Sequence, residues 1–272
     1  MLNPIDIKKL NKISKEKNSE YKNAFPFPHI IIDDFFDVDY LNTVMKEFPD
    51  LHSKKESIHH TGRTDEKLAS PRGVGFQKEF TKNLMMFLNG SEFIDFLQEL
   101  TGIKEKLIPD PHFIGGGLHQ TYKDGFLKIH ADFCKHPETN LDRRINLLIY
   151  LNKDWEDKYL GELHLFDKNM KESIKILPIF NRIVIFNTTD YTFHGVPEPL
   201  KCPLNTSRKS LALYYFSNGR PKNELRSILE SNSTIYKEME GEKFNLSMKS
   251  FLIKLIPPIF YPLIKKIKKN IS

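Results

Sequence analysis

The sequence predicts an all-β core with flanking helices, an α+β chain whose strands form a jelly roll. From residue 112 onward, short apolar and β-branched runs follow one another at regular spacing. Two amphipathic, helix-like stretches precede these runs at 81–102. Neither an internal repeat nor a Gly/Ser-rich linker divides the chain. Eight or so strands at this spacing favour a sandwich or barrel, and the two-sheet jelly roll is the natural choice.

In the N-terminal part, the sequence predicts a leader followed by a strand and a helix. Residues 1–24 are rich in Lys, Asn and Ser, which indicates a loose or partly helical leader without the apolar region of a signal peptide. Residues 26–36 read as a strand. Asp37 can cap a helix that ends before Pro49. We assign 25–222 to one domain, with helical support over 37–103 and the jelly-roll core over 112–218.

Residues 50–78 are polar and poorly periodic. This pattern favours a solvated loop, and a lid over a substrate is the alternative. The segment offers Arg63 and Arg72 as candidate substrate contacts. Its adjacent His59 and His60 would point apart on a helix or a strand, so we do not expect them to share a metal ion.

Helices and strands then follow in order. Helices are expected over 81–89 and 91–102, with Ser91 as a cap and Gly102 as the end of the second. Eight strand-like runs come next, at 113–122, 126–133, 144–152, 161–167, 174–180, 182–188, 192–198 and 209–217.

Bulk properties narrow the function classes. The net charge of +6 stands beside 35 acidic residues, and much of the excess lies in the KKIKK run near the C-terminus. We therefore expect no nucleic-acid partner. The two cysteines are too few for a disulfide framework and favour a reducing, cytoplasmic setting.

The tail, 223–272, combines a charged, helix-permissive stretch with an apolar and basic end. The apolar part, 251–264, is too short for a membrane span and is interrupted by Pro257, Pro258 and Pro262. Two interpretations remain: the tail docks on the protein's own surface, or it lies on an anionic membrane with its late lysines at the headgroups. Oligomeric state is open.

The residues that carry chemistry form a spaced set. His130 and Asp132 are two positions apart in a strand-like run, so they share one face and can reach one metal ion. His194 lies 62 residues after Asp132 in another such run. Two histidines and one carboxylate leave metal positions open, as in non-haem Fe(II) oxygenases. Arg208 and Ser210 are again two positions apart, and a guanidinium beside a hydroxyl suits a carboxylate.

This set resembles the iron(II)/2-oxoglutarate-dependent dioxygenases, in particular the prolyl hydroxylase-like branch, over roughly residues 25–221. The resemblance implies a double-stranded β-helix, Fe(II), 2-oxoglutarate as cosubstrate, O2, and ascorbate as a supporting reductant. It assigns His130, Asp132 and His194 to the iron. It assigns Arg208, Ser210 and Tyr122 to the cosubstrate.

The resemblance also implies a reaction and a range of substrates. Related halogenases lack the carboxylate that Asp132 supplies, so hydroxylation of an unactivated C–H bond is expected. The His-x-His pattern of cupin enzymes and the second Arg of nucleic-acid demethylases are both missing. Prolyl or other peptidyl residues are the first candidate substrates, followed by amino acids, sugars and other small molecules. A non-catalytic jelly-roll binding or scaffold protein is the alternative from another class, and a superfamily member that acts on nucleic acid is a further alternative.

Further substrate contacts are expected near the metal. Asn146 and Tyr150 are four positions apart and share one face of a strand that lines the pocket in relatives, although the sequence leaves open which face. His136 lies close after Asp132. These three join Arg63 and Arg72 as candidate substrate residues.

Overall fold

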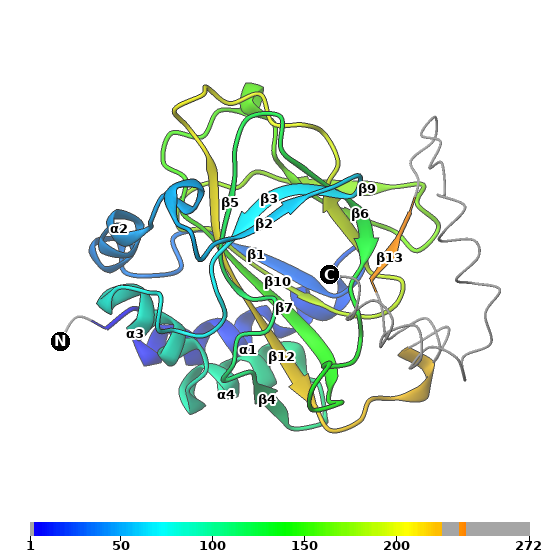
Figure 1. The fold of residues 1–272 in the computed structure, drawn as a ribbon. Coiled ribbons are helices and arrows are strands. Elements are labelled where there is room, and N and C mark those ends of the chain that lie inside the picture. Colours follow the sequence, from blue (N-terminus) through cyan, green and yellow to red (C-terminus); the bar gives the residue numbers. More distant parts are fainter. Residues whose placement is uncertain (1–2, 225–233, 238–272) are drawn as a thin grey trace, which may run out of the picture. The chain divides into compact units, whose positions relative to one another are not determined.

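Antiparallel strands form the central sheet of the computed structural model, which describes residues 3–224 and 234–237 (Figure 1). One curled sheet runs in the order β1-β10-β7-β12-β5-β3-β6-β11-β8-β9, with β2 added to β3, β4 to β12 and β13 to β6. The strands are β1 (His29–Ile32), β2 (Ile58–Thr61), β3 (Asp65–Ala69), β4 (Leu107–Pro109), β5 (Gly117–Thr121), β6 (Phe126–Ala131), β7 (Asp142–Tyr150), β8 (Leu163–Phe166), β9 (Ser173–Ile176), β10 (Ile183–Asn187), β11 (Phe193–Val196), β12 (Arg208–Ser217) and β13 (Ile235–Tyr236).

The jelly-roll prediction is confirmed. All eight predicted strand-like runs contain a strand, β5 to β12. The sheet curls so that β7, β12 and β5 lie across the interior from β6 (Figure 1), and residues of both halves line one compartment. Residues 113–116 fall outside β5 because the chain turns there, with positive φ at Phe113 and Gly115.

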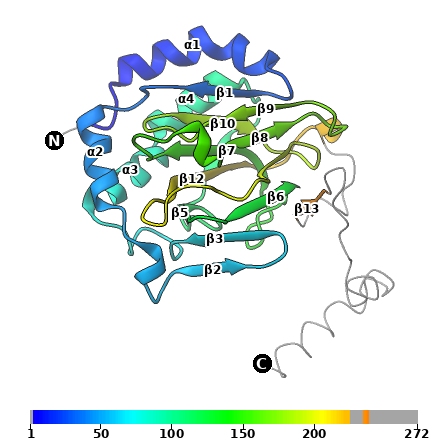
Figure 2. The ribbon, with the colours of Figure 1, turned by 90° about the horizontal axis from the view of Figure 1, so that it is seen from above.

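Four helices cover one side of the sheet (Figures 1 and 2): α1 (Ile7–Asn23), α2 (Val38–Glu47), α3 (Glu79–Leu88) and α4 (Ser91–Thr101). The Asp37 carboxylate caps α2 by accepting a hydrogen bond from the Tyr40 amide at 2.8 Å. Gly102 ends α4 in the left-handed conformation, at φ 63°. The expected leader is α1, whose Leu10 and Tyr21 are fully buried in the core.

The alternation of β7 and β12 separates the core from the cavity. Ile145, Leu147 and Ile149 of β7 pack with Leu213 and Tyr215 of β12 in the cluster beneath the helices. The residues between them face the interior of the curl, where polar groups collect. The sheet thus has an apolar outer face and a functional inner face.

The segment 50–78 is a β-hairpin for much of its length, and the prediction of a solvated loop is wrong for these residues. β2 pairs with β3, and β3 pairs with both β5 and β6. The sequence missed this because backbone pairing with distant strands, and not an apolar pattern, stabilises the hairpin. Three short 3-10 helices, Leu51–Ser53, Asp157–Tyr159 and Lys222–Glu224, complete the described elements.

Most of the C-terminal tail, including the apolar and basic stretch, lies outside the described residues. Of this part only 234–237 is described beyond Glu224, and β13 pairs there with β6. Within the described residues, no helix combines the length and the apolar character needed to span a membrane.

Candidate active site

Three candidate metal ligands meet on two paired strands. His130 on β6 lies directly opposite His194 on β11, and their ring centroids are 4.5 Å apart. Asp132 follows β6, and its two oxygens lie 3.6 Å from His130 Nε2 and 3.4 Å from His194 Nε2. The ligand atoms of the three residues all lie within 4.8 Å of one another. Their spacing in the sequence and their strand register thus produce one cluster.

The orientation of both histidines suits a metal ion. His130 Nδ1 lies 2.8 Å from the Lys128 carbonyl, and His194 Nδ1 lies 3.1 Å from the Thr192 carbonyl. A carbonyl accepts, so Nδ1 carries the proton and Nε2 keeps a lone pair toward Asp132. Burial and the neighbouring His130 lower the pKa of His194 to about 4. His194 is therefore a neutral imidazole at pH 7, which is the form that binds metals.

Asp132 is fixed by two polar neighbours on β7. Arg143 Nη2 donates to Asp132 Oδ2 at 2.9 Å, and Asn146 Nδ2 donates to the same oxygen at 2.7 Å. Arg143 also donates to Asn146 Oδ1, so the three side chains form one network. Burial opposes the charge, but Arg143 and the two histidines hold the pKa of Asp132 well below its usual range. The group is an anion ready to bind a cation.

Two imidazole nitrogens and one carboxylate oxygen fit Fe(II), and among the described residues no fourth protein ligand joins the cluster. A second group in the described residues, Glu162, His164 and Glu198, also has ligand atoms this close together. There the Lys175 ammonium already forms an ion pair with Glu198 at 3.7 Å. His130, Asp132 and His194 are the better candidate metal site.

Arg208 lies in the same inner compartment, which measures about 100 Å³ and also contains Ser210. Its Nε donates to the Gly161 carbonyl at 2.8 Å, and its Nη2 donates to the Tyr150 hydroxyl at 3.2 Å. Nη1 has no hydrogen-bond partner among the described residues. A buried, oriented guanidinium with a donor to spare can bind a carboxylate.

Tyr122, the expected cosubstrate hydroxyl, lies elsewhere. It follows the last residue of β5, and the alternation directs His119 and Thr121 toward the inner compartment instead. The Tyr122 hydroxyl donates to Asp50, and the ring lines a different cavity. The structure therefore does not support the cosubstrate role expected for Tyr122, because its side chain is on the opposite face of the strand.

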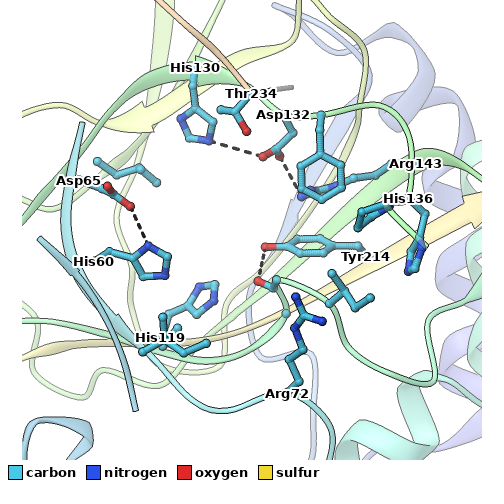
Figure 3. Close-up of a pocket in the computed structure, with 18 of the residues that line it drawn as sticks. His60, Asp65, Arg72, His119, His130, Asp132, His136, Arg143, Tyr214 and Thr234 are labelled. Atoms are coloured by element: carbon cyan, nitrogen blue, oxygen red, sulfur yellow. Dashed lines mark hydrogen bonds and ion pairs between the residues drawn. The ribbon is translucent and has the colours of Figure 1, made fainter. Parts of the chain in front are cut away.

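A cavity of about 770 Å³ adjoins the inner compartment (Figure 3). His130, Asp132, His119 and Tyr214 line both spaces, so the cavity leads to the candidate ligands. Its wall carries His136 and Arg72, two of the candidate substrate residues, and Arg72 forms an ion pair with Glu138 at 3.3 Å.

The remaining predicted substrate residues have other positions. Arg63 is exposed between β2 and β3 and lines neither space. Asn146 and Tyr150 share the inner face, as their spacing required, but they contact Asp132 and Arg208. Both are positioning residues of the candidate site.

Several cavity residues were missed by sequence reasoning. Tyr214 continues the alternation of Arg208 and Ser210 on β12, a signal that was available, and Arg143 stacks 3.5 Å from its ring. Tyr236 of β13 lies against His130, with centroids 5.6 Å apart. Lys67 of β3 lines both spaces. Its polar segment gave no sign of a strand.

Comparisons with known proteins agree with this geometry. Residues 117–216 match the family model described as the 2OG-Fe(II) oxygenase superfamily. Prolyl 3-hydroxylase OGFOD1 of Mus musculus is 25% identical over 199 residues, which cover 70% of this chain and 33% of that protein. The chain thus spans about a third of the length of this curated relative.

Solved structures share the fold. One is a prolyl hydroxylase from Trichoplax adhaerens in complex with a hypoxia inducible factor oxygen degradation domain peptide fragment. Its TM-score is 0.58 at 17% sequence identity, and the match covers 78% of this chain and 92% of the Trichoplax chain. A prolyl-4-hydroxylase from Pseudomonas putida has a TM-score of 0.54 at 13% identity and covers 75% and 99%. The family match runs from β5 to β12 and contains all three candidate ligands and Arg208, so this part of the chain is similar to the 2OG-Fe(II) oxygenase superfamily. The solved prolyl hydroxylases show that the fold is shared as well.

Proposed function

We propose that the protein is an Fe(II)- and 2-oxoglutarate-dependent dioxygenase that hydroxylates a C–H bond of a peptidyl residue, with proline as the first candidate. Bound together, Fe(II), 2-oxoglutarate and O2 supply the oxidising chemistry that yields succinate, CO2 and an alcohol. The similar proteins reported above are prolyl hydroxylases, which supports this choice of substrate. Sugars and other small molecules are the second class.

Each side chain of the inner compartment has a defined part. His130, Asp132 and His194 would hold the iron. Arg208 and Ser210 would bind the distal carboxylate of the cosubstrate at the other end. Leu148, Leu163, Phe186 and Val196 line the same space and would exclude water from it.

One observation carries the proposal. The candidate ligands come from β6 and β11, Arg208 comes from β12, and all four line one small compartment between the two halves of the sheet. A metal ion and a dicarboxylate can therefore be bound side by side. A scaffold protein would have no need for this arrangement of buried charges.

An anaerobic titration tests the proposal without knowledge of the substrate. Fe(II) followed by 2-oxoglutarate should produce a visible metal-to-ligand charge-transfer band in the wild-type protein. His194→Ala should lose the band, whereas His29→Gln, a change at another buried strand histidine, should keep it. Absence of the band from the folded wild-type protein would favour the non-catalytic alternative.

A substrate screen that follows succinate formation, with and without ascorbate, then identifies the class of substrate. Prolyl peptides are tested beside amino acids and sugars of similar size. We also propose a reducing compartment, a setting that the two buried, unpaired cysteines, Cys134 and Cys202, support.

A further inference from the structure

Three nitrogen-bearing side chains share one face of neighbouring strands beside the candidate iron site. Asp65, Lys67 and Ala69 of β3 line the large cavity. His60 lies directly opposite Lys67 on β2, and His119 lies opposite Ala69 on β5. Residues opposite each other point to the same face, so His60, Lys67 and His119 form one cluster. Figure 3 shows His60 and His119 across the hollow from His130 and Asp132.

Lys67 differs from the other cations of this cavity. Arg72 forms an ion pair with Glu138, Lys135 with Asp142 at 2.8 Å, and Arg143 with Asp132. Lys67 has neither a hydrogen bond nor an ion pair to any residue that the structure describes. The nearby Asp65 carboxylate lies 3.4 Å from His60 Nδ1 instead. Lys67 thus has no ion-pair partner among the described side chains.

The surroundings make this charge costly in the free protein. Burial lowers the pKa of Lys67, and Arg208 and Arg143 lower it further, against Asp65 and Asp132. An ammonium in such a place is stabilised when an anion arrives, because the pair compensates for the lost hydration.

The position of Lys67 indicates which of two anions, the cosubstrate or the primary substrate, it would bind. Arg208 already has a free donor for the cosubstrate inside a compartment of only about 100 Å³. Lys67 and His119 line this compartment and also the 770 Å³ cavity, so they lie where the two spaces join. A cavity of the larger size can hold a drug-sized ligand, such as a short peptide.

We propose that Lys67, flanked by His60 and His119, binds a carboxylate of the primary substrate, so that the enzyme acts on acidic peptides with an Asp or Glu next to the modified residue. This inference rests on the proposed function, since it assigns the substrate class of the same site. Lys67 is the specificity-determining residue, and the two imidazoles add neutral hydrogen-bonding groups beside it.

Calorimetric binding tests this in protein loaded with Zn(II) and saturating 2-oxoglutarate, which cannot turn over. The probes are N-acetyl-prolyl-glutamate amide and its glutamine counterpart, which have the same shape and differ in charge. Wild-type protein should bind the glutamate peptide at least about tenfold more tightly, as expected for a hydrogen bond between charged groups. Lys67→Gln should abolish this preference, and Lys67→Arg should retain part of it.

Lys175→Gln is the matched control, because it removes the same charge from strand β9, where Lys175 pairs with Glu198 outside the cavity. It should keep the full preference. Equal binding of the two peptides to the wild type, or no binding of either, would overturn the inference. So would a Lys67→Gln protein that keeps the preference or loses affinity for 2-oxoglutarate instead. The anaerobic charge-transfer band distinguishes failure of this inference from failure of the proposed function. If the band is present and the peptides bind equally, only this inference is wrong. If the band is absent, the proposed function is wrong.

Discussion

Arg208 is held in place before any anion arrives. The Gly161 carbonyl and the Tyr150 hydroxyl each take one of its donors, and Tyr150 is itself completely buried. Preorganisation of this kind reduces the side-chain entropy that binding must otherwise remove. In the proposed enzyme, specificity for a dicarboxylate would therefore depend on Arg208 and on the residues that position it.

Changes at Arg208 should act on the cosubstrate and not on the primary substrate. Truncating one partner of a buried charge pair costs on the order of 2–5 kcal/mol, so Arg208→Ala should raise the concentration of 2-oxoglutarate needed for the anaerobic band more than tenfold. Tyr150→Phe keeps the ring and loses one hydrogen bond, so it should raise this concentration only severalfold. Unchanged titrations for both variants would show that another residue binds the cosubstrate.

Acid should destabilise the metal-free protein partly through His29. This residue is 7% exposed, its Nδ1 lies 2.8 Å from the Phe27 carbonyl, and burial lowers its pKa. As the pH falls below about 6.5, the unfolded chain takes up a proton that the folded protein resists, so the free energy of unfolding decreases. Urea unfolding of chelator-treated protein at pH 7.5 and 5.5 measures the decrease. His29→Gln should make it smaller, and an unchanged decrease would refute the assignment.

At the scale of elements, the metal site depends on the close approach of β6 and β11. The two strands pair at His130 and His194, and Gly195 follows the second histidine. A Cβ at Gly195 would lie 2.7 Å from the Leu127 carbonyl oxygen and 2.9 Å from that of Lys128, closer than such atoms approach. Glycine is therefore required here for strand packing.

Gly195→Ala should push β11 away from β6 and separate the two histidines. We expect a loss of about 1–3 kcal/mol in unfolding free energy, as for other overpacked sites, together with weaker metal binding. Gly75→Ala is the control, because a Cβ at Gly75 meets no atom within 4 Å. Urea unfolding and metal titration measure both effects, and wild-type affinity in Gly195→Ala would contradict the argument.

The same scale explains what the sequence could and could not predict. The strands between 113 and 217 follow from the local alternation of side chains, which can be read from one sequence. The same alternation places His130 and Asp132 on one face. The hairpin that carries Lys67 depends on pairing with β5 and β6, where the paired residues are fifty or more positions apart in the sequence. The role expected for Tyr122 is not supported for a related reason. Neighbouring residues of a strand point to opposite faces, so Thr121 faces the inner compartment and Tyr122 does not.

For the whole molecule, the inner compartment joins the two halves of the curled sheet. The candidate ligands lie on the β6 and β11 side, and Arg208 lies on the β12 side. The hairpin strand β3 bridges the halves by pairing with β5 and β6. A metal ion with 2-oxoglutarate would add a second bridge, through groups that are already buried.

Ligand loading should therefore stabilise the entire fold in two separable steps. A ligand present at a hundred times its Kd adds about 2.7 kcal/mol to the free energy of unfolding, which for a unit of this size corresponds to roughly 5–10 °C in Tm. Anaerobic thermal unfolding should show one increase with Fe(II) and a further one with 2-oxoglutarate, and a chelator should reverse both. In Arg208→Ala the first increase should remain and the second should become much smaller, because of the two ligands only the cosubstrate would contact the guanidinium. In Asp132→Ala both should disappear, since the cosubstrate is then left without its metal. A full second increase in Arg208→Ala would mean that the cosubstrate does not bridge the halves as the positions of these residues require.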